Sequence, residues 1–309
     1  MSSIDDALLL QDVAAGIDTM WLIIAGTLVF FMQAGFAMVE AGSISSKNTI
    51  NVLFKNVLDA CIAGIGFWLI GYGIAYGQTS NGFIGTSPGV YALSSRSVEE
   101  YDSWFFQFSF AATAATIVSG SVSERCMIDA YFIYTFFIVT WIYPIIVCWV
   151  WGEGWLSAYS VHSTYYLFYG SRSNNFIDFA GSGVVHMTGG MSGLVAATLL
   201  GPRQGRFNED GSINNREGHS ATIYILGVLI LWVGWYGFNC GSTLCMVGSQ
   251  CSVVAGKVAV NTTMTAASAG ITMIIYQRGI NDHYNLFTLG NAILSGLVSV
   301  TASCAVIEP

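Results

Sequence analysis

The chain has 309 residues, of which 54% are hydrophobic and only 9% are charged, and its mean hydropathy is +0.60. Soluble globular domains carry about 25% charged residues, so the composition excludes an ordinary soluble domain and indicates a helical membrane protein. The formal net charge of −8 and the lack of a basic stripe argue against a nucleic-acid partner.

Eight apolar runs are long enough to predict membrane-spanning helices, so the expected fold class is all-α and polytopic. The runs cover residues 19–42, 50–76, 103–122, 127–150, 179–200, 219–242, 253–275 and 285–306. Polar or glycine- and serine-rich segments connect them, and no soluble domain or internal repeat is visible. We therefore expect one membrane domain over residues 1–309, with an uncleaved first span rather than a signal peptide.

Lysine and arginine are distributed unequally between the two sets of loops. One set contains only Arg96 and Arg172, whereas the other contains Lys47, Arg125, Arg203, Arg206, Arg216 and Arg278. Because positively charged loops stay in the cytoplasm, we expect the second set to be cytoplasmic and the acidic N-terminus to lie outside. An even number of spans would return the C-terminus to the outside as well.

The seven cysteines are scattered through apolar runs, and none has the spacing of a metal site. We expect no metal and no cofactor. Cys245 and Cys251 flank a short outer loop and could pair, but burial as unpaired apolar residues is the favoured interpretation. Asn261 opens a glycosylation sequon inside a predicted span, so no sugar is expected there.

Residues 177–194 combine Asp178, five glycines and His186 in one membrane-length segment. An ionisable side chain inside such a segment is a functional-site hypothesis by default; the alternative is a hydrogen bond to a neighbouring helix. Eight residues separate Asp178 from His186, about 12 Å along a helix axis, so the two are not predicted to bond. Asp178 is placed either to cap the helix or to add negative potential for a cation.

Aromatic residues recur at helical spacing in two of the spans. Trp235, Phe238 and Ser242 share one helical face of the sixth span, and Phe106 and Phe110 are i, i+4 neighbours in the third. Such stripes are more often core packing or an interfacial belt than a ligand site. By themselves they are weak indications of function.

Three tryptophans, Trp149, Trp151 and Trp155, mark the outer end of the fourth span. They are typical of an interfacial anchor, although a tryptophan that turns inward can also bind a small cation over its ring.

Four further ionisable residues lie within predicted spans: Glu40, Lys55, Asp59 and Lys257. Lys55 and Asp59 are i, i+4 and could pair. Lys257 is near the outer end of its span and could extend its amine toward water.

In chain order, many segments resemble the ammonium transporter (Amt/Mep/Rh) family, specifically its plant-type eukaryotic branch. The most specific is Asp-Phe-Ala-Gly-Ser-Gly-Val-Val-His at residues 178–186. The other matching segments are residues 33–42, 46–49, 56–59, 120–125, 187–190, 218–221, 234–242 and 301–309. The resemblance covers nearly the whole chain.

The resemblance implies a membrane transporter, not an enzyme, that forms a homotrimer with one pore in each subunit. It also implies roles for individual residues. Trp151, Phe110 and Ser242 would form an outer recruitment site for ammonium, and Phe110 over Phe238 would form a gate. Phe106, Trp235 and His186 would line the pore. Asp178 would keep the site in shape and favour cation entry.

Members of the family have eleven spans, arranged as an inverted five-plus-five repeat and a final helix. The present sequence ends after the eighth predicted span, whereas the family's second pore histidine comes from the tenth. The remaining histidines, His162, His219 and His283, do not match that position.

The resemblance implies transport of ammonium or methylammonium across a membrane, most simply the plasma membrane. The alternatives are an ammonium-sensing receptor or a non-transporting truncated homologue. A retinal photoreceptor, suggested only by Lys257, and a neutral-gas channel of the Rhesus type are weaker alternatives.

Overall fold

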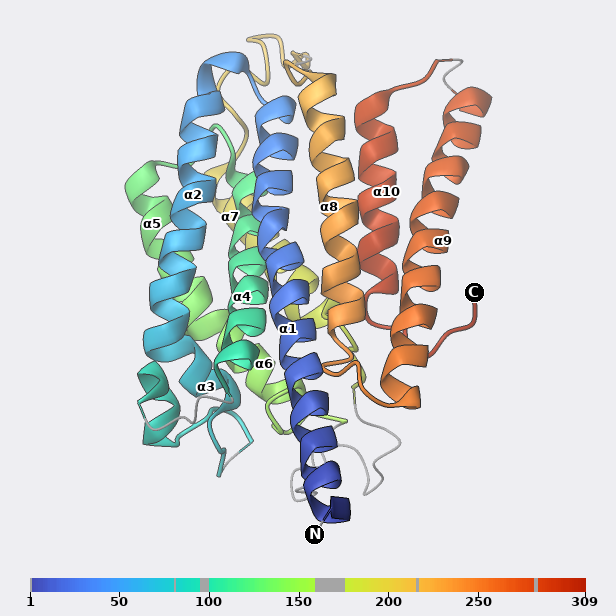
Figure 1. The fold of residues 1–309 in the computed structure, drawn as a ribbon. Coiled ribbons are helices and arrows are strands. Elements are labelled where there is room, and N and C mark those ends of the chain that lie inside the picture. The colour runs from blue at the N-terminus through green and yellow to red at the C-terminus, as the bar shows by residue number, and fades with distance from the viewer. Residues whose placement is uncertain (1, 81, 95–99, 159–175, 215–216, 281–282) are drawn as a thin grey trace.

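A computed structural model describes residues 2–80, 82–94, 100–158, 176–214, 217–280 and 283–309 of the chain. The helices run side by side as a bundle (Figure 1). Within the described ranges, seven helical segments are long and apolar enough to cross a membrane. The prediction of an all-α polytopic fold is confirmed. His162 and three of the loop arginines (Arg96, Arg172 and Arg216) lie outside the described residues.

The helix bounds follow the apolar runs closely. The longer α-helices are α1 (Ser2–Ser43), α2 (Thr49–Gly66), α4 (Tyr101–Val122), α8 (Ala221–Gly241) and α9 (Ser249–Ile280). The shorter ones are α3 (Tyr72–Tyr76), α5 (Ile128–Phe137), α6 (Tyr143–Val150), α7 (Thr188–Leu200) and α10 (Leu286–Val300). π-Helical turns at Phe67–Gly71, Ile138–Ile142 and Ser182–Met187 continue into α3, α6 and α7.

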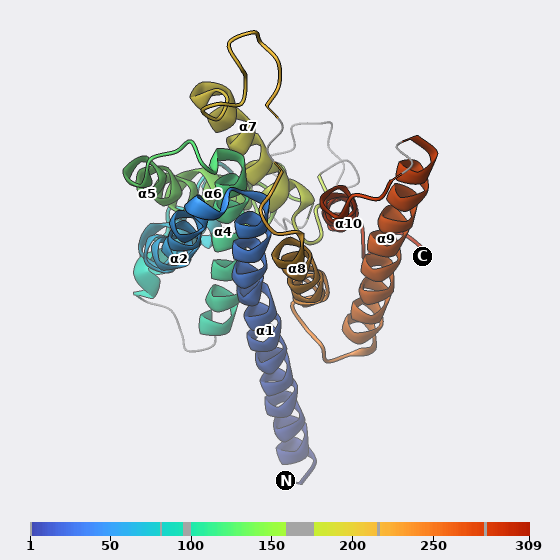
Figure 2. The same ribbon diagram turned by 90° about the horizontal axis from the view of Figure 1, so that it is seen from above.

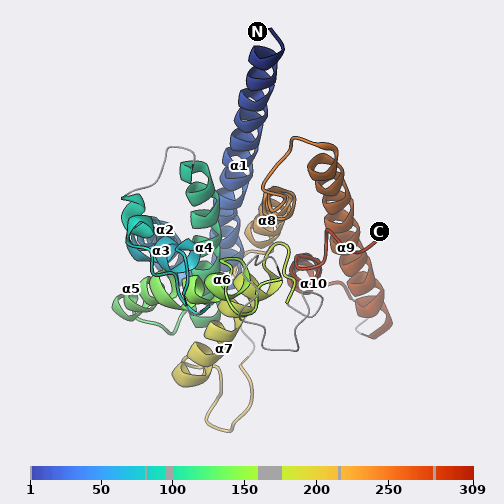
Figure 3. The same cartoon turned by 90° about the horizontal axis from the view of Figure 1, so that it is seen from below.

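The first and last predicted spans differ most from the observed helices. Helix α1 begins at Ser2 rather than near residue 19 and projects beyond the bundle at its N-terminal end (Figures 1 and 3). Helix α10 ends at Val300, whereas the apolar run continues to residue 306. At about 1.5 Å per residue its 15 residues span about 22 Å, less than the hydrocarbon thickness of about 30 Å.

Tertiary hydrogen bonds account for the early end of α10. The backbone N–H groups of Phe179 and Ala180 donate to the carbonyls of Ala302 and Thr301, at 3.0 and 3.1 Å. The Asn261 amide donates to the carbonyls of Cys304 and Ile307. These donors come from distant segments, so the apolar pattern alone does not reveal the turn.

Helix α4 is the inner helix of the bundle. Its most apolar window is 78% buried, against 50% or less for the other six spans. Helices α1, α2 and α7 pack around it, and α9 lies at the edge, where it contacts both α8 and α10 (Figure 2). The segments that join α1 to α2, α4 to α5 and α7 to α8 lie at the upper end in Figure 1.

Hydroxyl groups of α4 and of Ser123, which follows it, donate hydrogen bonds to polar side chains of α1 inside the bundle. Thr116 donates to Gln33 at 2.8 Å, and Ser119 and Ser123 donate to the buried Glu40 carboxylate at 2.7 and 3.2 Å. A buried polar group is costly unless it is hydrogen-bonded. These bonds therefore fix the register of α1 against α4.

Two sequence-based interpretations are wrong. Lys55 forms no ion pair with Asp59 within the described ranges; its amine donates to the Cys126 carbonyl at 3.0 Å, while Asp59 accepts bonds from Tyr131 and Thr135. Cys245 and Cys251, favoured as unpaired, form a disulfide. The short outer loop brings the two thiols together, and periodicity gives no sign of this.

Glycine makes the close contact between α1 and α8 possible. A Cβ atom on Gly227 would lie 2.5 Å from the Val39 nitrogen and 2.7 Å from the Gly35 carbonyl oxygen. Without a side chain at this position, the two backbones approach directly, as small residues allow in membrane bundles.

We expect Gly227→Ala to destabilise the protein by about 1–3 kcal/mol, because the added methyl group overpacks a rigid backbone contact. Thermal unfolding in detergent, followed by tryptophan fluorescence, measures the effect. Gly256→Ala is the matched control, because nothing lies within 4 Å of its Cβ position. Equal stability of the two variants would show that α1 and α8 do not depend on this contact.

Candidate functional site

A buried carboxylate organises the segment that carries the histidine. Asp178 is fully buried, and its two oxygens accept the backbone N–H groups of Gly181, Gly183 and Val184 at 2.8–2.9 Å. Gly181 has a φ of +111°, which only glycine adopts easily. The carboxylate therefore caps the π-helical turn Ser182–Met187, on which His186 lies.

The main-chain carbonyl of Asp178 fixes a second part of the site. It accepts the indole N–H of Trp151 at 2.7 Å. Trp151 follows the last residue of α6, so this bond joins the end of α6 to the start of the histidine segment. One residue thus positions both the tryptophan and the turn that leads to His186.

Aromatic rings from α4, α6, α8 and the histidine segment form a continuous chain of contacts. Trp151 meets Phe110 edge-on, with ring centroids 6.1 Å apart. Phe110 stacks on Phe238 at 4.1 Å and an interplanar angle of 25°. Phe238 lies 5.3 Å from the His186 ring, which stacks on Trp235 at 5.1 Å and 13°. We call these five rings the aromatic column.

Trp151 differs from the two tryptophans beside it. Trp149 and Trp155 gather around Phe83, and Trp149 donates its indole N–H to the Phe83 carbonyl at 3.0 Å. They anchor the segment after α3. Trp151 turns the other way, toward Phe110. Sequence alone could not decide which of the three faces inward.

His186 is 7% exposed, and its Nε2 has no hydrogen-bond partner among the described residues. The simple alternative, in which the imidazole is hydrogen-bonded to a neighbouring helix, is therefore not what the structure shows at this nitrogen. A buried polar atom without a partner is costly. It is available to a small polar ligand.

The other two candidate residues lie beside the aromatic column. Phe106 contacts Phe110 at 4.7 Å between ring centroids. Ser242 lies one turn beyond Phe238 on α8 and donates its hydroxyl hydrogen to the Phe238 carbonyl at 2.8 Å. Its oxygen can still accept a hydrogen bond. The described residues show no hydrogen bond between Ser242 and Trp151.

Sequence reasoning missed one supporting residue, Thr301. Its buried hydroxyl accepts the indole N–H of Trp235 at 2.9 Å and donates to the Leu297 carbonyl at 2.7 Å. Trp235 in turn supports the His186 ring. The only signal in the sequence is that residue 301 begins the last of the segments with family resemblance.

The fold and the buried column define a polytopic helical membrane protein with an aromatic and imidazole site at its centre. Comparison with known proteins identifies the family to which the chain belongs. Residues 20–309 match the Ammonium Transporter Family, so the chain belongs to the ammonium transporter family.

Relatives from several kingdoms are similarly close. The chain is 40% identical to ammonium transporter 1 member 3 of Solanum lycopersicum, over 96% of this chain and 65% of that protein. Identity to ammonium transporter Amt2 of Archaeoglobus fulgidus is also 40%, over 95% and 61%. The chain thus spans about two thirds or less of the length of these relatives.

Solved structures give the same fold. A structure described as a sensor Amt protein matches with a TM-score of 0.86 and 36% identity, over 97% of this chain and 71% of that one. Mep2 of Candida albicans matches with a TM-score of 0.77 and 26% identity, over 93% and 61%.

Asp178→Asn removes one acceptor oxygen and places an amide N–H against backbone N–H groups. We expect the variant to lose about 1–3 kcal/mol of stability, the usual cost of leaving buried donors unsatisfied. Thermal unfolding in detergent is the measurement. Asp129→Asn, at an exposed position in the first turn of α5, is the control and should change little. An unchanged melting temperature for Asp178→Asn would contradict the capping role.

Proposed function

We propose that the protein moves ammonium or methylammonium across a membrane, and that the aromatic column is its route. The observation that supports this most strongly is the line of ring contacts from Trp151 through Phe110 and Phe238 to His186. It leads from an inward-facing tryptophan to a buried imidazole with a free nitrogen.

Trp151, Phe110 and Ser242 recruit the cation in this proposal. The faces of aromatic rings attract a small cation, with tryptophan the strongest. Each N–H group of the ion also needs an acceptor once water is removed, and the Ser242 oxygen can supply one. The mouth therefore favours ammonium over neutral molecules.

Phe110 and Phe238 then act as the gate. Their rings are in van der Waals contact at 4.1 Å between centroids, so a ligand passes only when they separate. Phe106 and Trp235 form the wall beside them. Below the gate an intact ion would be expensive to desolvate.

His186 handles the desolvated substrate. A neutral imidazole can hydrogen-bond to ammonia and can take up or pass on a proton near neutral pH. Splitting ammonium into ammonia and a proton lowers the barrier to crossing. Asp178 keeps this segment in shape, and its charge near the mouth favours cation entry.

The remaining parts of the proposal concern the assembly. The protein forms a homotrimer of single membrane domains, with a pore in each subunit, in the plasma membrane. Its N-terminus lies outside, because the lysine- and arginine-rich loops belong in the cytoplasm. As with its relatives, the activity is transport rather than enzymatic catalysis.

A second candidate function is ammonium sensing without transport. The similarity to a structure described as a sensor Amt protein favours it. The photoreceptor alternative loses its only support, because the Lys257 amine pairs with Glu308 at 2.6 Å.

Uptake of radiolabelled methylammonium into proteoliposomes tests the proposal directly, with ammonium-dependent quenching of tryptophan fluorescence measured in parallel. Uptake together with quenching supports transport. Quenching that is lost in Trp151→Phe, without uptake, supports the sensor. The absence of both would contradict an ammonium site on this chain.

Trp151→Leu should weaken the apparent affinity for methylammonium about 2- to 30-fold, since a cation–π contact contributes about 0.5–2 kcal/mol. Concentration-dependent uptake, or calorimetric titration with methylammonium, measures this. Trp149→Leu is the matched control, because that ring packs on Phe83 and should affect stability but not affinity. Unchanged affinity in a protein carrying both Trp151→Leu and Ser242→Ala would show that the recruitment site lies elsewhere.

His186→Ala should reduce methylammonium flux about a hundredfold or more, as loss of a proton-transferring group typically does, while quenching at the mouth is retained. His219→Ala is the control, because that imidazole lies just before α8 and contacts the carbonyl of Ile44, the residue after α1. Wild-type flux and selectivity in a folded His186→Ala protein would contradict a role for the imidazole.

A further inference from the structure

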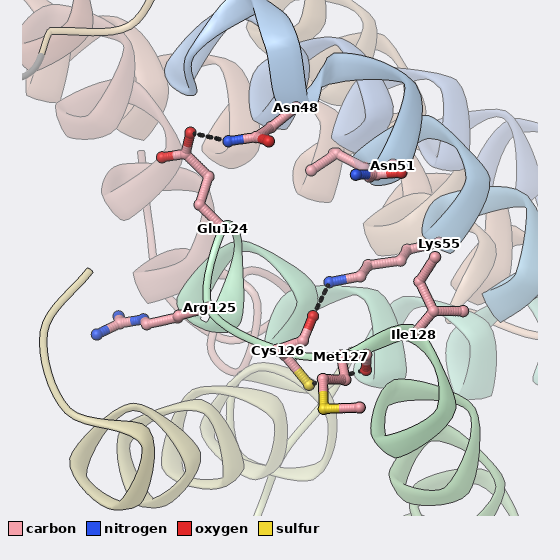
Figure 4. Close-up of a pocket in the computed structure, with 9 residues that line it drawn as sticks. Asn48, Asn51, Lys55, Glu124, Arg125, Cys126, Met127 and Ile128 are labelled. Carbon is pink, nitrogen blue, oxygen red and sulfur yellow. Dashed lines mark hydrogen bonds between the residues drawn. The ribbon is translucent and has the colours of Figure 1, made fainter. Parts of the chain in front are cut away.

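A cavity lies at the lysine- and arginine-rich end of the bundle, away from the aromatic column. It has a volume of about 260 Å³ and opens between α2 and the turn that joins α4 to α5 (Figure 4). Its lining combines cations, amides and apolar side chains: Asn48, Asn51, Val52, Lys55, Glu124, Arg125, Cys126, Met127 and Ile128.

Lys55 brings a buried positive charge to this cavity. It is 4% exposed, its amine donates one bond to the Cys126 carbonyl, and it lies 5.0 Å from the centroid of the Tyr131 ring. The ammonium group has three N–H donors, and Figure 4 shows it pointing across the opening. Asp59, one turn along α2, bonds instead to Tyr131 and Thr135.

Arg125 also lines the cavity, but its guanidinium group is bonded to protein carbonyls. Its two terminal nitrogens donate to the carbonyls of Gly201 and Ser121, both at 2.6 Å, and its Nε is buried without a partner. In the part of the chain that the structure describes, neither Arg125 nor Lys55 lies within 4.0 Å of a carboxylate. The Arg125 side chain points away from the opening in Figure 4, so Lys55 is the cation that faces this cavity.

Glu124 is the acid in the lining, and its charge is used elsewhere. It forms an ion pair with Arg203 at 3.1 Å and accepts bonds from the Asn48 amide and the Ser45 N–H. Burial raises the pKa of this carboxyl, but the bonds from Asn48 and Ser45 and the Arg203 charge together bring its pKa below the usual value. Asp129, exposed at the start of α5, is not among the lining residues.

The rim of the cavity is apolar on the α5 side. Met127 and Ile128, which line the cavity, are 74% and 38% exposed. Such exposed side chains near the end of a membrane helix are suited to lipid chains. A ligand here would need a negative head and an apolar body.

We propose that this cavity binds the phosphate of an anionic phospholipid head group, with Lys55 as its charged donor and Met127 and Ile128 beside the acyl chains. Guanidinium and ammonium groups are the usual partners of phosphate, and basic pockets between membrane helices on the cytoplasmic side bind anionic head groups. The Asn48 and Asn51 amides can complete the shell. Free inorganic phosphate shares the same chemistry and is separated from lipid by the experiment.

Cys126 supplies a probe inside the cavity. It lines the opening and is half-buried, so a bound head group should shield its thiol from a maleimide. A Cys61→Ser background removes the other accessible free thiol among the described cysteines, since Cys148, Cys240 and Cys304 are buried. Burial raises the pKa of the Cys126 thiol, so labelling is carried out at alkaline pH.

The purified chain in detergent is reacted with the maleimide under four conditions. These are added phosphatidylglycerol, added phosphatidylcholine, added inorganic phosphate and no addition. At about ten times its dissociation constant, phosphatidylglycerol should slow labelling about tenfold. Protection by phosphatidylglycerol alone assigns the site to a lipid. Equal protection by inorganic phosphate supports the phosphate site but assigns it to the free ion. Equal labelling in all four conditions, or equal protection by phosphatidylcholine, would overturn the proposal.

Charge variants separate this site from general surface attraction. Lys55→Gln should abolish protection, and Lys55→Arg should retain it, which also shows that the position tolerates substitution. Lys47→Gln removes an exposed cation at the same end of the bundle that does not line the cavity. If Lys47→Gln weakens protection as much as Lys55→Gln, the lipid binds through the overall charge of this face and the specific site is refuted.

Discussion

The site depends on one buried carboxylate at the start of the histidine segment. Asp178 uses its side chain to hold the backbone of Gly181, Gly183 and Val184 and uses its carbonyl to hold the Trp151 indole. In lipid, backbone groups need internal partners, and an irregular turn such as this one lacks part of its own ladder. The same bonds that make the turn possible therefore fix the Trp151 ring relative to the His186 segment.

A second support comes from the end of α10. The Ser182 hydroxyl donates to the Val298 carbonyl and accepts the Ala302 N–H, so the histidine segment and the turn after α10 are tied together. Thr301 then holds Trp235, on which His186 stacks. The π-helical geometry at His186 fits this arrangement, because π-turns interrupt helices most often at functional positions. Neither the short α10 nor the π-turn is an isolated irregularity; together they build the inner part of the site.

Much of the fold could be predicted because lipid allows few solutions. The length of an apolar run predicts a span, and the runs locate every long helix to within a few residues except the start of α1. The end of α10 could not be predicted, because donors from Asn261 and Phe179 stop the helix while the sequence stays apolar.

The candidate site was also predictable only in part from the sequence. Spacing placed Trp235, Phe238 and Ser242 on one face, and family resemblance selected Trp151, yet nothing local distinguishes Trp151 from Trp149. That choice depends on a hydrogen bond to Asp178, 27 residues away. The predicted Lys55–Asp59 ion pair was wrong for the same reason. The Cys126 carbonyl and the Tyr131 ring, from other segments, are more favourably placed for the Lys55 amine than Asp59 is.

The central claim is that a small cation binds over the inward-facing rings at the mouth of the aromatic column. An electron cryo-microscopy map of the protein with bound methylammonium tests it most directly. The account predicts density within about 6 Å of the Trp151 and Phe110 ring centroids, the range of cation–π contact, on the side of the Phe110–Phe238 pair away from His186. Methylammonium bound away from these rings, with the column unoccupied at saturating concentration, would contradict it.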